Sequence, residues 1–345
     1  MFNWDFLSVN AFLGSEMDAR AIKSALELGL IDALFVEGAR SLATLSVARR
    51  VHPRGLALLV DMLEVNGVVG RNGDIVELTP EFRAAFRFRD LLESRIAFAD
   101  LVWPDIHNLF TPLLNDLPQF MARSKVFDLF RYDRCIEVTE ANLAATRAWT
   151  KFTTCLTKYE AGALLDEVDL TGVRDHIDLG GNTGEFALRV CQRRAELSAT
   201  VVDLPVVCEL GRRHIQAFAT PDEAARIAFF PTDMRVGALP KAADLVSFKS
   251  VLHDWPDDDA SHLLERARGL TRPGGRILIF ERAPIDVRGR RIPYVMAPDL
   301  VFLHFLRPAD LYVGKLAELG FVEIEHRRLE LDIGFHLVTA RLPSA

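Results

Sequence analysis

The sequence predicts an α/β protein with two domains, a mostly helical one followed by one built on a largely parallel sheet. The chain has 345 residues, more than one domain of ordinary size contains. From about residue 173 onward, short apolar runs alternate with helical patterns, which is typical of a parallel sheet with helices on both faces. Before that point, apolar residues recur mainly at helical spacing.

The composition excludes several classes of protein. Half of the residues are hydrophobic and 26% are charged, which is the balance of a folded chain. The formal net charge of −7 gives no bulk attraction for nucleic acid or for an anionic membrane. The four cysteines form no CxxC pair, and the sequence shows neither a signal peptide nor a membrane-spanning run. We therefore expect a soluble cytoplasmic protein.

The first hundred residues have the outline of a winged helix, in which a β-hairpin follows packed helices. The expected elements are two helical pieces over 19–34 broken at Gly29, a helix from a Ser41 cap to Arg50, a helix over 55–66 closed by Asn66-Gly67, and a hairpin with its turn at 71–74.

A winged helix raises the alternative that the chain is a DNA-binding regulator. The second helix argues against this alternative, since between Leu56 and Val65 its only charges are those of Asp61 and Glu64. A recognition helix needs Lys or Arg for phosphates and polar side chains for base edges. We therefore expect this domain to serve dimerisation rather than DNA binding.

The rest of the chain is expected to be helical over about 90–158 and to form a sheet from residue 173. Six strands are predicted, at 176–179, 199–203, 227–230, 244–248, 275–281 and 336–340. Ligands of such sheets bind outside the carboxyl ends of the strands, so the residues that follow each strand are the candidate site.

A glycine-rich loop follows the first predicted strand. It reads Asp178-Leu-Gly-Gly-Asn-Thr-Gly184 and precedes a helix, where glycines allow a tight turn and close approach of backbone N–H groups to a ligand. Asp203 ends the next strand, where a carboxylate accepts hydrogen bonds from both hydroxyls of a ribose. Asp233 and Met234 follow the third strand and offer an acid and an apolar contact suited to adenine.

These motifs, with Phe248–Trp255 and Arg272–Glu281, resemble those of the class I S-adenosylmethionine-dependent methyltransferases, in particular the two-domain small-molecule O-methyltransferases. The resemblance implies a winged-helix dimerisation domain with helical connectors over residues 1–165, a Rossmann-like methyltransferase domain over 166–345, and a homodimer. It implies that S-adenosyl-L-methionine is bound by residues of these motifs, namely Asp178, Gly180, Gly181, Gly184, Asp203, Leu204, Asp233, Met234 and Lys249.

The resemblance also identifies a reacting centre. His253, after the fourth strand, matches the general base that deprotonates a phenol, a task suited to neutral imidazole. Glu281, 28 residues on, matches the glutamate that orients this histidine. The family's second glutamate is missing, because Leu306 stands at its position.

A histidine near the missing glutamate suggests a different chemistry. His253, Asp254 and His304 together form a possible two-histidine, one-carboxylate metal site. This set resembles a branch of the family that C-methylates 2-oxo acids, where a metal stabilises the attacking enolate. Iron, zinc, cobalt and nickel all suit such ligands. We expect this C-methylation, with Arg131 or Arg134 holding the acceptor's carboxylate and Trp103 beside the pocket.

Simpler interpretations stay open. His304 in an apolar segment is then a hydrogen-bonded core residue, the two arginines are surface charges and Trp103 is part of the core. The enzyme is in that case a metal-free O-methyltransferase with His253 as its base and Glu281 as the orienting group.

Overall fold

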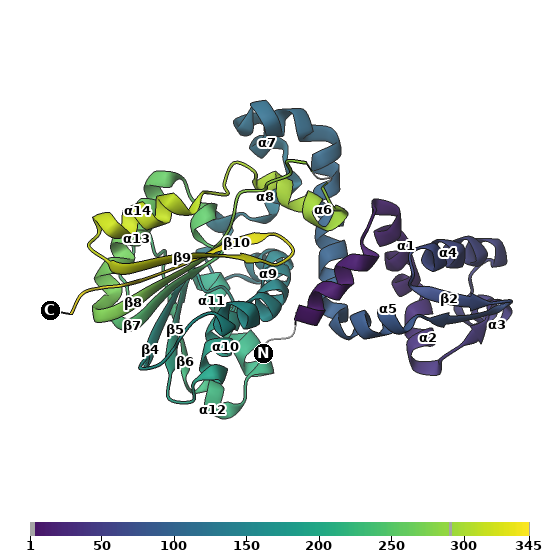
Figure 1. The fold of residues 1–345 in the computed structure, drawn as a ribbon, viewed down its shortest axis with the longest axis horizontal. Coiled ribbons are helices and arrows are strands. Elements are labelled where there is room, and N and C mark those ends of the chain that lie inside the picture. Colours follow the sequence, from purple (N-terminus) through teal and green to yellow (C-terminus); the bar gives the residue numbers. More distant parts are fainter. Residues whose placement is uncertain (1–3, 290–291, 345) are drawn as a thin grey trace. The chain divides into compact units, whose positions relative to one another are not determined.

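The computed structural model describes residues 4–289 and 292–344, and it confirms the α/β class (Figure 1). The chain divides into two compact units. One contains residues 4–106 and the described residues between 287 and 299, and the other contains residues 107–286 and 300–344. The helices over 107–166 thus group with the sheet, whereas the sequence analysis assigned them to the N-terminal domain.

The first unit has the expected winged-helix outline. The Gly29 break is confirmed by its left-handed φ of 65°, and Ser41 caps α3 by accepting a hydrogen bond from the backbone N–H of Thr44. The elements are η1 (Trp4–Phe12), α1 (Glu16–Glu27), α2 (Leu30–Glu37), β1 (Arg40–Ser41), α3 (Leu42–Arg49), α4 (Pro53–Val65), β2 (Val69–Asn72), β3 (Ile75–Leu78), α5 (Pro80–Ala85) and η2 (Phe86–Phe88). The strand β1, too short to show a pattern in the sequence, pairs with β3.

Helices follow the hairpin, as the sequence predicts. They are α6 (Arg89–Asn115), α7 (Leu117–Arg123), α8 (Lys125–Leu129), η3 (Tyr132–Cys135) and α9 (Glu140–Asp166). The last of them, α9, contacts α10 (Glu185–Arg193) and α11 (Pro205–Phe218) within the same unit and thereby brings its side chains close to the glycine-rich loop.

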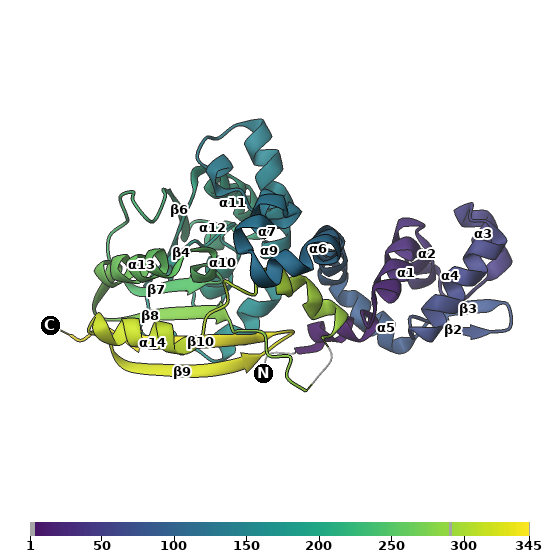
Figure 2. The same cartoon turned by 90° about the horizontal axis from the view of Figure 1, so that it is seen from above.

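A seven-stranded sheet with the order β6-β5-β4-β7-β8-β10-β9 forms the second unit. Its strands are β4 (Asp175–Leu179), β5 (Ser198–Asp203), β6 (Ile227–Pro231), β7 (Ala243–Lys249), β8 (Thr271–Arg282), β9 (Val322–Glu330) and β10 (Gly334–Arg341). All six predicted strands are confirmed. In this sheet β10 pairs antiparallel with β8 and with β9, and the other pairs are parallel. The sequence analysis missed β9, an outer edge strand whose side chains are nearly all exposed (Figure 2).

Strand order reverses between β4 and β7. From β4 the chain proceeds through α10 to β5, while from β7 it proceeds through α13 to β8 in the opposite direction. Right-handed crossovers in opposite directions place these helices on opposite faces of the sheet and open a ligand crevice at the carboxyl ends of β4 and β7. The helical elements that follow α9 along the chain are α10 (Glu185–Arg193), α11 (Pro205–Phe218), α12 (Pro221–Ala224), η4 (Leu252–Asp254), α13 (Asp257–Leu270), η5 (Tyr294–Phe302) and α14 (Ala309–Glu318).

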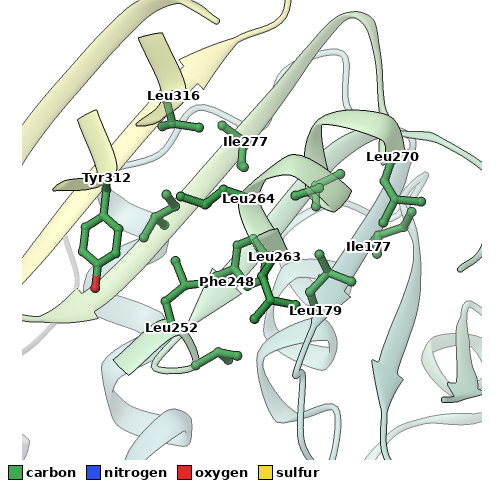
Figure 3. Packing of buried hydrophobic residues seen from close by; sticks show 14 of the residues in the cluster. Ile177, Leu179, Phe248, Leu252, Leu263, Leu264, Leu270, Ile277, Tyr312 and Leu316 are labelled. Atoms are coloured by element: carbon green, nitrogen blue, oxygen red, sulfur yellow. The ribbon is translucent and has the colours of Figure 1, made fainter. Parts of the chain in front are cut away.

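An apolar core anchors the strands that end at this crevice. Figure 3 shows Leu263 of α13 and Tyr312 of α14 packed in one cluster with Phe248 of β7. Leu252, which directly precedes His253, is fully buried in the same cluster. Because core side chains are close-packed, this contact fixes one end of the turn that carries His253.

Candidate active site

The glycine-rich loop leaves β4 at the reversal point of the sheet. Gly180 and Gly184 have left-handed φ values of 68° and 78°, which glycine adopts readily. A Cβ on Gly181 would lie 2.5 Å from Asp178 Oδ2 and 2.9 Å from the Val201 side chain. The loop therefore needs glycine at Gly181 for space as well as for a close backbone approach to a ligand.

Asp203 lies beside this loop, at the carboxyl end of β5. Its carboxylate accepts hydrogen bonds from the backbone N–H groups of Asn182, at 2.8 Å, and Leu204, at 2.7 Å. Burial raises the pKa of Asp203 to about 6, although these two donors oppose the shift. A carboxylate has lone pairs for further donors, so it can still accept from the hydroxyls of a ligand.

Asp178, under the loop, belongs to a buried polar chain. Ser247 Oγ donates to Asp178 Oδ1 at 2.6 Å and lies 2.7 Å from His176 Nε2. Burial raises the pKa of Asp178 to about 7 and lowers the pKa of His176 to about 3. Asp178 Oδ2 is buried and has no hydrogen-bond partner within the described residues, so it is free to accept from a ligand or water.

Asp233 and Met234 follow β6, as expected. Two nitrogens of the Arg235 guanidinium bind the Asp233 carboxylate at 2.8 and 3.0 Å and hold the pKa of that carboxyl below its usual range. The same guanidinium lies 4.1 Å above the Trp255 ring. Met234 is buried in the core cluster described above.

Lys249, at the end of β7, lies in a buried ion-pair network. Its Nζ is 2.5 Å from Glu160 Oε2 and 3.2 Å from Thr157 Oγ1, both on α9. Glu160 Oε1 also accepts from Arg282 at 3.1 Å. Because the buried Glu160 carboxylate pairs with both Lys249 and Arg282, this network connects α9 to the carboxyl ends of β7 and β8.

His253 and Glu281 form a buried pair at the crevice. His253 Nδ1 lies 2.6 Å from Glu281 Oε2, while Glu281 Oε1 accepts from the backbone N–H groups of Val251 and Leu252 at 2.7 and 2.8 Å. We assign Nδ1–H as the donor because Glu281 is fully buried among hydrogen-bond donors. Nε2 is then the acceptor nitrogen of the ring.

The electrostatics of this pair suit proton transfer. Burial works against a charged imidazole, but the carboxylates of Asp254 and Glu281 outweigh it, so the pKa of His253 is raised. Burial likewise opposes the charge of Glu281, yet His253 and the two backbone donors lower the pKa of its carboxyl. Glu281 therefore stays ionised and stabilises His253 once the ring has taken a proton.

The expected metal ligands do not come together. His253 Nε2 is 3.5 Å from Asp254 Oδ1, and Asp254 Oδ2 accepts from the Tyr132 hydroxyl at 2.9 Å. His304 instead lies on the turn after η5, with its Nε2 2.6 Å from the carbonyl oxygen of Leu113. Within residues 4–289 and 292–344, no group of three or more His, Cys, Asp or Glu side chains is placed to hold a metal ion. The three-residue ligand set is thus corrected, because His304 is engaged elsewhere.

The expected substrate anchors also have local partners. Arg131 pairs with Asp133 at 2.6 Å, and Arg134 pairs with Asp128 at 2.8 Å. Both arginines are substantially exposed, which favours the surface-charge interpretation, and their role as a carboxylate anchor stays a prediction. Trp103 stacks on Tyr294 within the first unit, with ring centroids 5.5 Å apart.

The sequence analysis missed the side chains that reach the site from distant segments. Asn182 of the loop donates to Thr153, and Thr183 lies 2.6 Å from Thr154, both partners being on α9. The only sequence signal is a series of threonines, with Glu160, within a helical pattern. Tyr132 and Arg307, which contact the segment around His253, gave no signal of their own.

Comparisons with known proteins agree on one family. A family model described as an O-methyltransferase domain matches residues 125–304, just over half of the chain. Aclacinomycin 10-hydroxylase RdmB of Streptomyces purpurascens is 29% identical and covers 85% of this chain and 77% of its own. Mitomycin biosynthesis 6-O-methyltransferase of Streptomyces lavendulae is 26% identical, covering 81% of this chain and 78% of its own.

Solved structures share the fold. The human N-acetylserotonin methyltransferase, solved in complex with S-adenosylmethionine (SAM), superposes with a TM-score of 0.71 at 22% identity, covering 95% of this chain and 94% of its own. In the part of this chain that the structure describes, no helix is long and apolar enough to cross a membrane.

Proposed function

The chain belongs to the O-methyltransferase domain family and is a SAM-dependent methyltransferase, and we propose that it methylates a hydroxyl group, phenolic or other, of a small molecule. The observation that carries the proposal is the buried His253–Glu281 pair at the carboxyl end of the sheet. Its geometry supplies an imidazole with one nitrogen fixed and the other available as a base.

The residues around the glycine-rich loop fit a SAM molecule. Asp178 offers a buried, unpartnered carboxylate oxygen, Gly181 leaves space that a Cβ would fill, and Asp203 ends β5 where ribose hydroxyls are bound in such folds. We propose that these residues, with Gly180, Gly184, Leu204, Asp233, Met234 and Lys249, hold SAM. When bound there, SAM supplies an electrophilic methyl group on a sulfonium sulfur.

The proton of the acceptor is handled by the chain itself. We propose that His253 Nε2 accepts the hydroxyl proton, which makes the acceptor oxygen nucleophilic as it meets the methyl carbon. Glu281 holds Nδ1–H and offsets the charge that develops on the ring, as its lowered pKa permits. Fixing base and acceptor in one orientation contributes further to the rate.

Metal-assisted C-methylation of a 2-oxo acid is the less favoured activity. The contact of His304 with Leu113 and the local ion pairs of Arg131 and Arg134 support O-methylation over this activity. The similarity to a 10-hydroxylase means that the assay must identify the product and not only the consumption of an acceptor.

The test is an acceptor screen with purified protein and SAM. Phenols and 2-oxo acids are assayed in parallel for S-adenosylhomocysteine and for a methylated product by mass spectrometry. We expect methylated phenols from the wild type and a loss of about 10²- to 10⁴-fold in rate with His253→Gln. Methylation of 2-oxo acids alone, or full activity of His253→Gln, would refute the proposal.

We also propose that residues 1–165 serve dimerisation and that residues 166–345 carry catalysis in a homodimer. The first unit exposes several large apolar side chains, among them Val36, Val47, Leu58 and Val65, each more than 60% exposed. Burying such side chains in an interface would favour association. Light scattering coupled to size-exclusion chromatography tests the assembly, and a monomer at micromolar concentration would contradict it.

A further inference from the structure

The segment Ser250–Trp255, here called the catalytic turn, is held in an unfavourable backbone conformation. Ser250 has a φ of 56°, in the left-handed region that non-glycine residues seldom adopt. Its side chain accepts a hydrogen bond from Arg282 at 3.0 Å, and its N–H donates to the Phe280 carbonyl at 2.8 Å. Such a conformation persists only where the surroundings fix it.

Glu281 fixes one side of the catalytic turn. Its Oε1 binds the N–H groups of Val251 and Leu252, and its Oε2 binds the His253 ring. These bonds restrain the backbone before His253. They leave the carbonyl groups of the turn and the residues after His253 without any restraint from Glu281.

Arg307 holds two backbone carbonyl groups of the catalytic turn, those of Leu252 and Trp255. It lies before α14, and its guanidinium donates from one nitrogen to the Leu252 carbonyl at 2.7 Å and from another to the Trp255 carbonyl. A third nitrogen pairs with Asp257, the first residue of α13. The side chain of Arg307 is only 9% exposed, so solvent competes little for these bonds.

The two carbonyl groups stand on either side of His253 and Asp254. A guanidinium is planar and rigid, so a single Arg307 side chain sets the separation and direction of both carbonyl groups. The backbone between them, which carries the imidazole, has little freedom left. Lysine can occupy the same space, but its single ammonium group cannot hold both carbonyl groups in the fixed geometry of a guanidinium.

We propose that Arg307 is a positioning residue for His253, which fixes the backbone on both sides of the base and keeps the imidazole against Glu281. This inference rests on the proposed role of His253 as a general base. Arg307 itself is not placed against the acceptor, and its effect passes through the backbone of the catalytic turn.

Arg226 provides a matched control for a purely structural role. Its NH1 also donates to backbone carbonyl groups, at 2.8–3.1 Å, namely those of Cys191, Arg194 and Leu197. It bridges the end of α10 to the start of β6, and within the described residues none of its hydrogen bonds reaches the catalytic turn. Replacing it removes comparable hydrogen bonds without releasing His253.

The experiment compares Arg307→Met, Arg307→Lys and Arg226→Met by a nuclear magnetic resonance titration of the His253 ring in the S-adenosylhomocysteine complex. The resonance is assigned with His253→Gln. In Arg307→Met we expect the pKa of His253 to fall toward the ordinary value of 6.5, because a looser ring loses both its carboxylate contact and its burial. Arg307→Lys should show a smaller fall, and Arg226→Met should titrate like the wild type.

Turnover gives the second measurement. With a hydroxyl acceptor, we expect kcat of Arg307→Met to fall about tenfold to 10²-fold while KM for SAM stays near the wild-type value. If only the melting temperature falls, with titration and kcat unchanged, the positioning role is refuted. A shift of the same size in Arg226→Met refutes it as well. If Arg307→Met does not fold, Arg307→Lys decides by the same criteria.

The outcomes separate this inference from the proposed function. The titration needs no acceptor, so a shifted pKa of His253 in Arg307→Met supports positioning even if the wild type methylates no hydroxyl. Failure of the acceptor screen with the wild type would then count against the proposed function alone. A normal titration in an active enzyme would count against Arg307 alone.

Discussion

Replacing Glu281 by glutamine tests the His253–Glu281 pair by changing charge and tautomer while keeping size. The carboxylate accepts three hydrogen bonds, two from backbone N–H groups and one from His253 Nδ1–H. An amide oxygen can retain the two backbone bonds, but its NH₂ group then faces Nδ1 and favours the ring tautomer protonated at Nε2. That tautomer cannot accept the acceptor's proton, so we expect kcat to fall about 10²- to 10⁴-fold.

The pH dependence of activity gives a second, independent test of Glu281→Gln. Loss of the negative charge lowers the pKa of His253, so the acidic limb of residual activity should move to lower pH than in the wild type. One charge-assisted hydrogen bond is lost, and unfolding should become easier by about 2 kcal/mol. The assays are steady-state kinetics over pH and urea denaturation.

Glu185→Gln is the matched control, because Glu185 is a second buried glutamate 2.6 Å from a histidine, His214. It should lose comparable stability and keep kcat. A Glu281→Gln enzyme with nearly wild-type kcat and an unmoved acidic limb would refute the role of Glu281. Equal loss of kcat in Glu185→Gln would show that the effect comes from general destabilisation.

Three further predictions concern the glycine-rich loop and His304. Gly181→Ala places a Cβ 2.5 Å from Asp178 Oδ2 and 2.9 Å from the Val201 side chain. We therefore expect calorimetry to show an affinity for S-adenosylhomocysteine that is reduced about tenfold or more. An unchanged affinity would contradict the loop geometry. His304→Ala removes the hydrogen bond to Leu113, so we expect a loss of about 1 kcal/mol in stability and chelator-insensitive activity near the wild-type level, whereas joint loss of bound metal and activity would restore the metal site. The pKa of Asp178 is about 7 in the folded protein and 3.8 in the unfolded chain, so its contribution to the free energy of unfolding without ligand should fall by at most about 4 kcal/mol between pH 4 and 7. Urea denaturation of Asp178→Asn should no longer show this fall, and the same pH dependence in wild type and variant would contradict the prediction.

Most of the fold could be predicted from sequence because its elements carry local signals. The strands β7, β8 and β10 contain apolar runs, since their side chains are mostly buried on both faces of the sheet. The edge strand β9 has no such signal: it is rich in Glu and Arg, and only pairing with β10 makes it a strand.

The site could be predicted only where its residues follow strands in the chain. The sequence predicts Asp203 and His253 as site residues in this way, and the structure places Asp203 at the end of β5 and His253 shortly after β7. Glu160 and Arg307 come from helix and loop segments that only the tertiary fold brings to the sheet. His304 was misread for the same reason, since its partner, the Leu113 carbonyl, stands 191 residues away in the chain.

The most direct test of the central claim is to locate the transferred methyl group on the product. Wild-type protein is supplied with isotopically labelled methyl-SAM and a mixture of phenols and 2-oxo acids, and the labelled product is examined by nuclear magnetic resonance. The account predicts the label on an oxygen atom, and no labelled product above background with His253→Gln. A label on the carbon next to a keto group, or equal labelling by His253→Gln, would contradict it.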